Sequence, residues 1–210
     1  MRTRAFAIMA TLAATALHAS ARGAPSFDCE RAQSKAETLI CIPETDLQWL
    51  DRQLARLFNL AKSVNADRDQ LTVEQRQFLG RRDACGADSA CITRVYKDRL
   101  HALAGRVNVY EAFAEFKREE GGSGDLWIAR FGAPAAIKIG TSGPNGHECF
   151  LEADDAVMTG RGVAKWRGGE EDACHIDVIP DGEDMRVETS GCEYYCGARA
   201  RFDGLFKRVQ

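Results

Sequence analysis

Gly121-Gly122-Ser123-Gly124 is the stretch at which the hydrophobic periodicity of this 210-residue sequence changes. Before it, apolar residues recur every three or four positions, as on the buried face of a helix. After it, short segments alternate apolar and polar residues, as half-buried strands do. Glycine and serine runs are typical of flexible connections. We therefore expect an α+β protein with a helical domain at 26–118, a Gly/Ser linker at 119–124 and a small β-domain at 125–210.

The clearest helix is expected at about 44–64. Its apolar residues would share one face at helical spacing: Leu47, Leu50, Leu54, Leu57, Phe58 and Ala61. A short helix is expected around 34–40. A capping-box pattern, Thr72-Val73-Glu74-Gln75, predicts the start of a helix at 72–84. The periodic stretch at 92–118 predicts one long final helix.

The β-domain is expected to be a small antiparallel barrel or sandwich. Its alternating segments are 137–139, 174–179 and 185–188. Turn signals separate them at 143–146, 154–155, 167–169 and 180–182. Short strands between frequent turns favour antiparallel pairing of neighbours.

The first 21 residues have the organisation of a secretory signal peptide. Arg2 and Arg4 supply a charged start, an apolar stretch follows, and Ala19-Ser20-Ala21 fits a signal peptidase site. We expect cleavage after Ala21, with Ala24 as an alternative position, and a periplasmic or secreted mature chain. No apolar run reaches about 18 residues, so we expect no membrane insertion of the mature chain.

Charge is low in total and unevenly distributed. The formal net charge of -3 argues against a nucleic-acid binder, because such proteins carry a basic surface. Residues 22–120 are neutral in sum, so the acidity of the mature chain lies in the β-domain. Acidic turns there would steer a basic protein partner, or would be ordinary solvated turns. The candidate binding residues are Asp154, Asp155, Glu170, Glu171, Asp172, Asp181, Glu183 and Asp184.

A series of motifs runs in order through the helical domain. Written as patterns, they are FDC at 27–29, ExxIC at 37–41, LxxLDxxL at 47–54, QRxFLxxRDxC at 75–85 and CxxxxYxxRL at 91–100. Over about residues 26–104, the chain resembles the N-terminal domain of the LprI-type lysozyme-inhibitor family. Phe78 departs from the family pattern, which has tryptophan there. The resemblance implies a helical, exported domain and, from the members that gave the family its name, inhibition of lysozyme.

Four of the eight cysteines lie in the helical domain, where two disulfides would stabilise a small core. We favour the local pairs Cys29–Cys41 and Cys85–Cys91, although four cysteines allow three pairings. The charged residues of the motifs form a candidate ion-pair set that links helices, with a binding epitope as the alternative. These residues are Asp51, Arg82, Asp83 and Arg99.

The other four cysteines lie in the β-domain, and an even count in an exported chain predicts that all are paired. Cys192–Cys196 would close a tight loop and leave Cys149–Cys174 to join two strands. The crossed pairs Cys149–Cys192 and Cys174–Cys196 are the alternative. The segment 191–206 is the densest part of this domain in cysteine, aromatic and glycine residues.

No arrangement of catalytic residues stands out. Zinc could be held by His147, His175 and neighbouring cysteines, but an oxidising compartment favours disulfides over thiolate ligands. Paired cysteines leave no reactive thiol, and the sequence has neither a G-x-S-x-G elbow nor a phosphate-binding G-x-x-x-x-G-K-[ST] loop. His101 is expected to be solvated on a charge-rich helix. We therefore expect no enzymatic activity, no metal and no cofactor.

The expected function is binding of a protein partner. Animal-type lysozymes are strongly basic and have a deep cleft with two catalytic carboxylates, so an acidic inhibitor would gain rate and orientation from its charge. Inhibition of lysozyme is the leading hypothesis. The alternatives are a structural or interaction module of the bacterial envelope, an unrecognised hydrolase and a metal-binding module.

Overall fold

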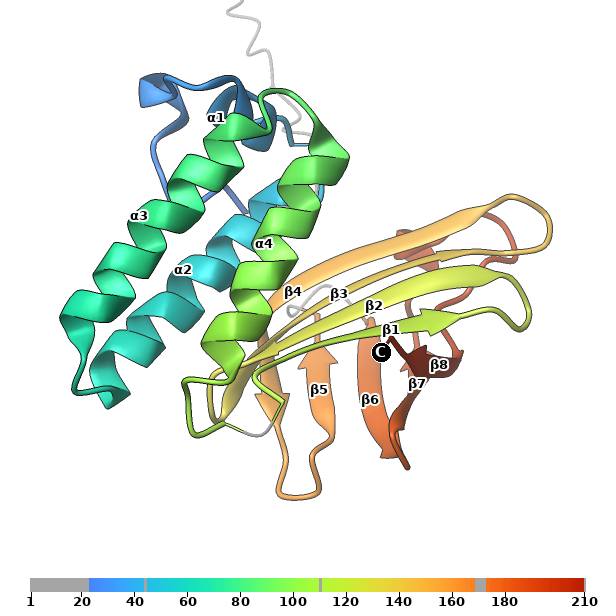
Figure 1. The fold of residues 1–210 in the computed structure, drawn as a ribbon. Helices are drawn as coiled ribbons and strands as arrows, with labels where there is room; N and C mark the ends of the chain where they lie inside the picture. Colours follow the sequence, from blue (N-terminus) through green and yellow to red (C-terminus); the bar gives the residue numbers. More distant parts are fainter. Residues whose placement is uncertain (1–22, 44, 110, 169–172, 210) are drawn as a thin grey trace, which may run out of the picture.

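A computed structural model describes residues 23–43, 45–109, 111–168 and 173–209. The expected signal peptide at 1–21 lies outside these residues. The chain folds as an N-terminal helical part followed by an antiparallel β-barrel, which confirms the α+β prediction (Figure 1).

The described residues of the helical part form four α-helices after a short 3-10 turn at Cys29–Arg31. The helices are α1 (Lys35–Ile40), α2 (Leu47–Val64), α3 (Arg68–Ala84) and α4 (Ser89–Ala104). Side chains at the N-termini fix where three of them begin. Ser34 and Glu37 form a reciprocal capping box on α1, while Asp67 and Asp88 accept backbone N–H groups at the starts of α3 and α4.

Two helix boundaries differ from the prediction. The third helix begins at Arg68 rather than at Thr72, because Asp67 caps it. The Thr72 hydroxyl instead donates to the carbonyl of Arg68 inside the helix, at 2.8 Å. The fourth helix ends at Ala104 rather than near Arg118. Of the apolar residues expected to continue it, Val107 lies in a connection and Phe113 lies in a strand.

The barrel has each strand paired with the one before it, and the last strand closes onto the first. The strands are β1 (Phe113–Arg118), β2 (Ser123–Arg130), β3 (Pro134–Ser142), β4 (Glu148–Met158), β5 (Ala164–Arg167), β6 (His175–Asp181), β7 (Asp184–Ser190) and β8 (Gly204–Arg208). Phe116 pairs with Arg208 at the closure between β1 and β8. The expected antiparallel β-domain is therefore a meander barrel and not a sandwich.

The prediction of a Gly/Ser linker at 119–124 is wrong. These residues join β1 to β2 as a hairpin inside the barrel, in a register where Arg118 pairs with Gly124. Gly122 has φ +120, and a Cβ there would lie 2.1 Å from the carbonyl oxygen of Ser142. The glycines therefore serve a tight turn against a neighbouring backbone, which only glycine permits.

The described residues form two apolar cores, and the second joins the helices to the barrel. Inside the barrel, a first core is lined by residues such as Ile128, Ile137 and Phe206. A second core joins the inward faces of the helices to the outer face of β1–β3, where Trp127 lies 5.9 Å from Trp49 between ring centroids. Figure 1 shows the helices against one end of strands β1–β4. The helices therefore pack on the barrel rather than standing apart from it.

All eight cysteines lie in the described residues and form four disulfides, which indicates an oxidising, extracytoplasmic location. Within the part of the chain described, we find no helix with the length and apolar character that a membrane crossing requires.

Candidate functional site

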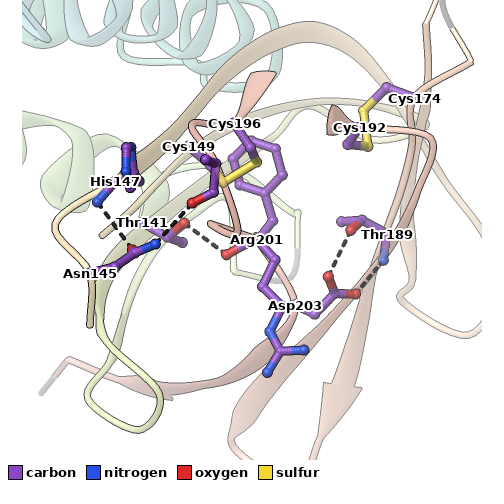
Figure 2. Close-up of a disulfide and its surroundings, with 12 residues drawn as sticks. Thr141, Asn145, His147, Cys149, Cys174, Thr189, Cys192, Cys196, Arg201 and Asp203 are labelled. Carbon is purple, nitrogen blue, oxygen red and sulfur yellow. Dashed lines mark hydrogen bonds between the residues drawn. A yellow bond between two sulfur atoms is a disulfide. The ribbon is translucent and has the colours of Figure 1, made fainter. Parts of the chain in front are cut away.

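The segment between β7 and β8 closes one end of the barrel. We call residues 191–203 the cap segment. It contains a 3-10 turn, η2 (Glu193–Tyr195), flanked on both sides by cysteines (Figure 2). It lies within the dense segment 191–206 noted in the sequence, to which no role could be assigned from sequence alone.

Two disulfides attach the cap segment to different parts of the sheet. Cys196 bonds to Cys149 in β4, and Cys192 bonds to Cys174 just before β6 (Figure 2). Both pairings considered from the sequence are therefore wrong. The register explains the outcome, because His175 pairs with Ser190 and so brings the residues just beyond that pair together. Cys149 and Cys196 likewise meet as an isolated antiparallel bridge.

Backbone hydrogen bonds fasten the cap segment along its length. Gly197 donates to the carbonyl of Glu148 at 2.7 Å, and the Asn145 side chain donates to the carbonyl of Ala198 at 2.9 Å. Near its end, the Thr141 hydroxyl donates to the carbonyl of Arg201, and Asp203 accepts from the N–H and hydroxyl of Thr189 (Figure 2). The segment is therefore ordered by contacts to β3, β4 and β7.

A buried arginine holds the same segment from inside the barrel. Arg118 alternates with Phe116 on the inner face of β1, and its Nη1 donates to the carbonyl oxygens of Arg201, Phe202 and Asp203. Burial lowers the pKa of Arg118, and the charge of Arg201 lowers it further. The Phe202 side chain is completely buried in the barrel core. The arginine thus satisfies three carbonyl oxygens of residues 201–203, whose backbone has no neighbouring strand to pair with.

The outer side of the cap segment presents aromatic side chains. Tyr194 is 78% exposed, the highest fraction among the large apolar side chains that the structure describes. Its ring packs edge-on against Tyr195, which packs edge-on against Trp166 of β5. The Trp166 indole N–H donates to Asp155 at 2.9 Å. Tyr194 and Trp166 were not among the residues expected from the sequence, where the available signal was a Tyr-Tyr pair enclosed by cysteines.

The structure separates the acidic residues that were expected to form one binding surface. Asp154 and Asp155 lie inside β4 rather than in a turn. They form a β-bulge, because Ala153 pairs with Ile137 while Ala156 pairs with Ala135. A bulge bends the strand, and polar residues there mimic a turn signal in the sequence.

The two bulge residues face different neighbours. Asp154 accepts from Arg52 Nε at 2.8 Å and from Gln53 Nε2 at 2.6 Å, so it is engaged with α2. Asp155 lies beside Trp166 and the aromatic side of the cap segment. Of this pair, Asp155 alone is brought to the candidate site.

The remaining acidic residues fall elsewhere. Glu170, Glu171 and Asp172 lie outside the described residues, in the β5–β6 connection that ends at Cys174. Asp181, Glu183 and Asp184 belong to the β6–β7 hairpin, at the barrel end opposite the cap segment. There Asp181 pairs with Arg186, and Asp184 accepts the backbone N–H of Arg208.

The charged residues of the helical motifs hold helices together. Asp51 accepts a 2.8 Å hydrogen bond from the Tyr96 hydroxyl, and Arg82 pairs with Glu37 and Asp83. Burial, followed by the charge of Asp51, raises the pKa of Tyr96 well above its ordinary value. Arg99 lies in a separate pair with Glu74 of α3. These contacts support the structural interpretation of the set. The predicted pairs Cys29–Cys41 and Cys85–Cys91 are confirmed.

The chemistry of the cysteines excludes two alternatives raised by the sequence. Each cysteine is bonded to another, so none can supply a thiolate to zinc or act as a nucleophile. Among the described residues, no group of at least three His, Cys, Asp or Glu side chains is placed to hold a metal ion. His101 is not merely solvated, since its Nε2 lies 3.1 Å from Glu115 Oε1.

Comparisons with protein-family models, with curated proteins and with solved structures each found no match.

Proposed function

We propose that this protein is an exported, non-catalytic binding protein that inhibits lysozyme or a similar basic cell-wall hydrolase. The contact would be made by the outer side of the cap segment. The observation that carries the proposal is Tyr194, a highly exposed aromatic side chain on a segment with a disulfide on either side.

Rigid aromatic side chains make efficient binding contacts. Tyrosine is enriched among the residues that contribute most to protein interfaces, since it buries a large area and carries a hydroxyl. Ordering a loop on binding costs free energy, and a loop that is already ordered avoids that cost. Cys192 and Cys196 enclose Tyr194 within five residues, so the ring is presented in advance of any encounter.

Charge favours a basic partner. Residues 121–210 carry a net charge of -5, and the exposed Glu193 and Asp155 lie at the aromatic side of the cap segment. An acidic surface raises the association rate with a basic protein and orients it. The resemblance of residues 26–104 to the LprI-type family supports a lysozyme as that protein. We further propose that the chain is periplasmic or secreted after cleavage of residues 1–21.

The test is protection of peptidoglycan. The mature protein with intact disulfides is mixed with animal-type, goose-type or invertebrate-type lysozyme, and clearance of a peptidoglycan suspension is followed by turbidity. We expect dose-dependent protection against one class. Tyr194→Ala should weaken it at least tenfold, because an exposed aromatic contact is lost while the fold remains.

Val64→Ala is the matched control, since Val64 is 56% exposed but lies at the end of α2. It should protect as the wild-type protein does. Absence of protection at large molar excess against all three classes contradicts lysozyme inhibition. In that case the same surface would serve an envelope protein partner, to be identified by crosslinking from residue 194.

A further inference from the structure

The barrel end opposite the cap segment contains a pocket of about 330 Å³. Four connections surround it: the 105–112 segment, and the β2–β3, β4–β5 and β6–β7 turns. Its apolar lining includes Val109, Met158, Pro180 and Met185. The volume is at the lower end of the range of about 300–1,000 Å³ for small-molecule sites, which are common in the mouths of β-barrels.

A buried arginine lines this pocket. Arg130 follows Leu126 and Ile128 on the inner face of β2, and the residue is 5% exposed. Its Nη1 donates to the carbonyl and to the carboxylate of Glu111, but its Nε has no hydrogen-bond partner among the described residues. Arg118 Nε at the other barrel end is also buried without a partner, so this donor is common to both inward-facing arginines.

Two arginines share one carboxylate beside the pocket. The Glu111 carboxylate is paired with both Arg130 and Arg208. Burial would raise the pKa of Glu111, yet hydrogen bonds from the two arginines hold it below its ordinary value, so the carboxylate is ionised. Arg130 lines the pocket, whereas the Arg208 side chain is 33% exposed and lies outside the lining. The remaining acidic lining residue, Glu183, is exposed at the tip of the β6–β7 turn.

The residue that supplies the carboxylate has an unusual backbone. Glu111 has φ +48, in the left-handed region that non-glycine residues rarely adopt. Such conformations concentrate at ligand sites, where the surrounding structure maintains them. Here the conformation places the carbonyl and the carboxylate of one residue on the same guanidinium nitrogen.

The other end of the barrel provides an internal comparison. Arg118 is also buried, inward-facing and near a barrel end, but its Nη1 is used by the carbonyls of the cap segment, whose Phe202 fills the barrel. Arg130 likewise donates to a backbone carbonyl, that of Glu111, but it also lines a pocket among the described residues. We propose that this pocket binds a small apolar monocarboxylate, with the carboxylate on Arg130 and the hydrocarbon against Val109, Met158 and Met185.

The methionines offer a direct measurement. Of the four methionines, Met1 and Met9 lie in the expected signal peptide, so the mature chain retains only Met158 and Met185. Both line the pocket. With methyl-labelled methionine, the NMR spectrum of the mature protein contains two signals that report on this site alone.

Octanoate is the probe, and octanol is the matched ligand without the charge. We expect octanoate to shift both methyl signals saturably and to bind at least tenfold more tightly than octanol. Arg130→Gln should reduce octanoate binding at least tenfold, to the level of octanol. Arg186→Gln removes an exposed charge from the β6–β7 hairpin, where Arg186 pairs with Asp181, and should leave binding unchanged.

Val109→Trp supplies a variant that keeps every ion pair. The indole would fill the pocket from the 105–112 connection, so we expect this variant to abolish the shifts of the methyl signals. It remains a usable test if Arg130→Gln fails to fold. Three results overturn the proposal: no shift at about 10 mM octanoate, where a Kd of about 1 mM would be near saturation; equal affinity for octanoate and octanol; or undiminished binding by Val109→Trp.

Discussion

Arg52 in α2 and Asp154 in β4 form an ion pair of 2.8 Å between Nε and Oδ2, although 102 positions separate them in the sequence. The Nη2 of Arg52 also lies 3.0 Å from Glu152 Oε2, and Arg56 donates to the carbonyl of Asp154. The bulge in β4 therefore turns its polar atoms toward a helix. Glu152 and Asp154 therefore hold the junction of the helical part and the barrel, whereas Asp155 faces the cap segment.

The first prediction concerns this junction. Asp154→Asn should lower the free energy of unfolding by about 1–2 kcal/mol, because charge-assisted hydrogen bonds from Arg52 and Gln53 are weakened. Urea denaturation measures the change. Asp181→Asn is the control, since its pair with Arg186 is about half exposed on both sides and should contribute less than about 1 kcal/mol. Equal effects of the two variants would show that the junction pair has no special role.

The second prediction concerns electrostatic steering. Reversing the charge at Glu170, Glu171 and Asp172 should slow association with a basic lysozyme about tenfold at low ionic strength, and salt should remove most of the difference. Stopped-flow measurements at several salt concentrations test this. Reversing Asp181, Glu183 and Asp184, at the opposite barrel end, should have a smaller effect. If the first triple variant associates at the wild-type rate, the β5–β6 connection is not part of the approach surface.

The third prediction concerns the two disulfides of the cap segment. Cys149–Cys196 spans 47 positions and Cys174–Cys192 spans 18. Chain-entropy reasoning assigns about 4 kcal/mol to the longer loop and about 3 kcal/mol to the shorter one. Replacing each pair by alanine should therefore destabilise the protein in that order, as measured by thermal unfolding. The reverse order would mean that native contacts of the cap segment, rather than loop length, decide the difference.

The fourth prediction concerns pH. Glu115 in β1 accepts from His101 and pairs with Lys97, both in α4. Burial raises the pKa of Glu115, but these hydrogen bonds outweigh it and hold the pKa below its ordinary value of 4.5. A carboxylate whose pKa is lowered by folding stabilises the protein above the unfolded value, and that stabilisation is lost as the pH falls through the folded value.

Glu115→Gln should accordingly cost about 1–2 kcal/mol at pH 7 and less near pH 3, because the stabilisation by the wild-type carboxylate is lost as the pH falls through its folded pKa. Unfolding curves at both pH values make the comparison. A cost that does not depend on pH would assign the effect of the substitution to packing rather than to charge.

Some elements were predictable because one signal acted alone. The 34–40 helix and α2 each have a clear apolar face. The barrel follows from alternating segments between turns. β1 was hidden because both of its faces are covered: Phe113 faces the helices, while Ala114 and Phe116 face the barrel interior. A strand buried on both sides has no alternation to detect, and its apolar spacing continued that of α4.

The candidate site was less predictable than the fold. The cysteine pairing of the barrel depends on strand register and on where the cap segment crosses, and neither is encoded within a few residues. Asp154 shows the same limit: two adjacent aspartates favour a turn locally, whereas the structure uses them as a bulge against Arg52. Tyr194 has no local signature of exposure, since its exposure results from disulfides to two distant strands.

The closure of β8 onto β1 has a consequence for how the chain is made. An exported chain emerges from its N-terminus, so the helices are available to cover β1–β3 as those strands appear, and each later strand adds to the one just completed. The free side of β1 has no partner until residues 204–208 emerge, some ninety positions later. An unpaired strand edge exposes N–H and C=O groups that can pair with another chain and start aggregation. The period between the first strand and the last is therefore the interval in which the edge of β1 is open to pairing with another chain.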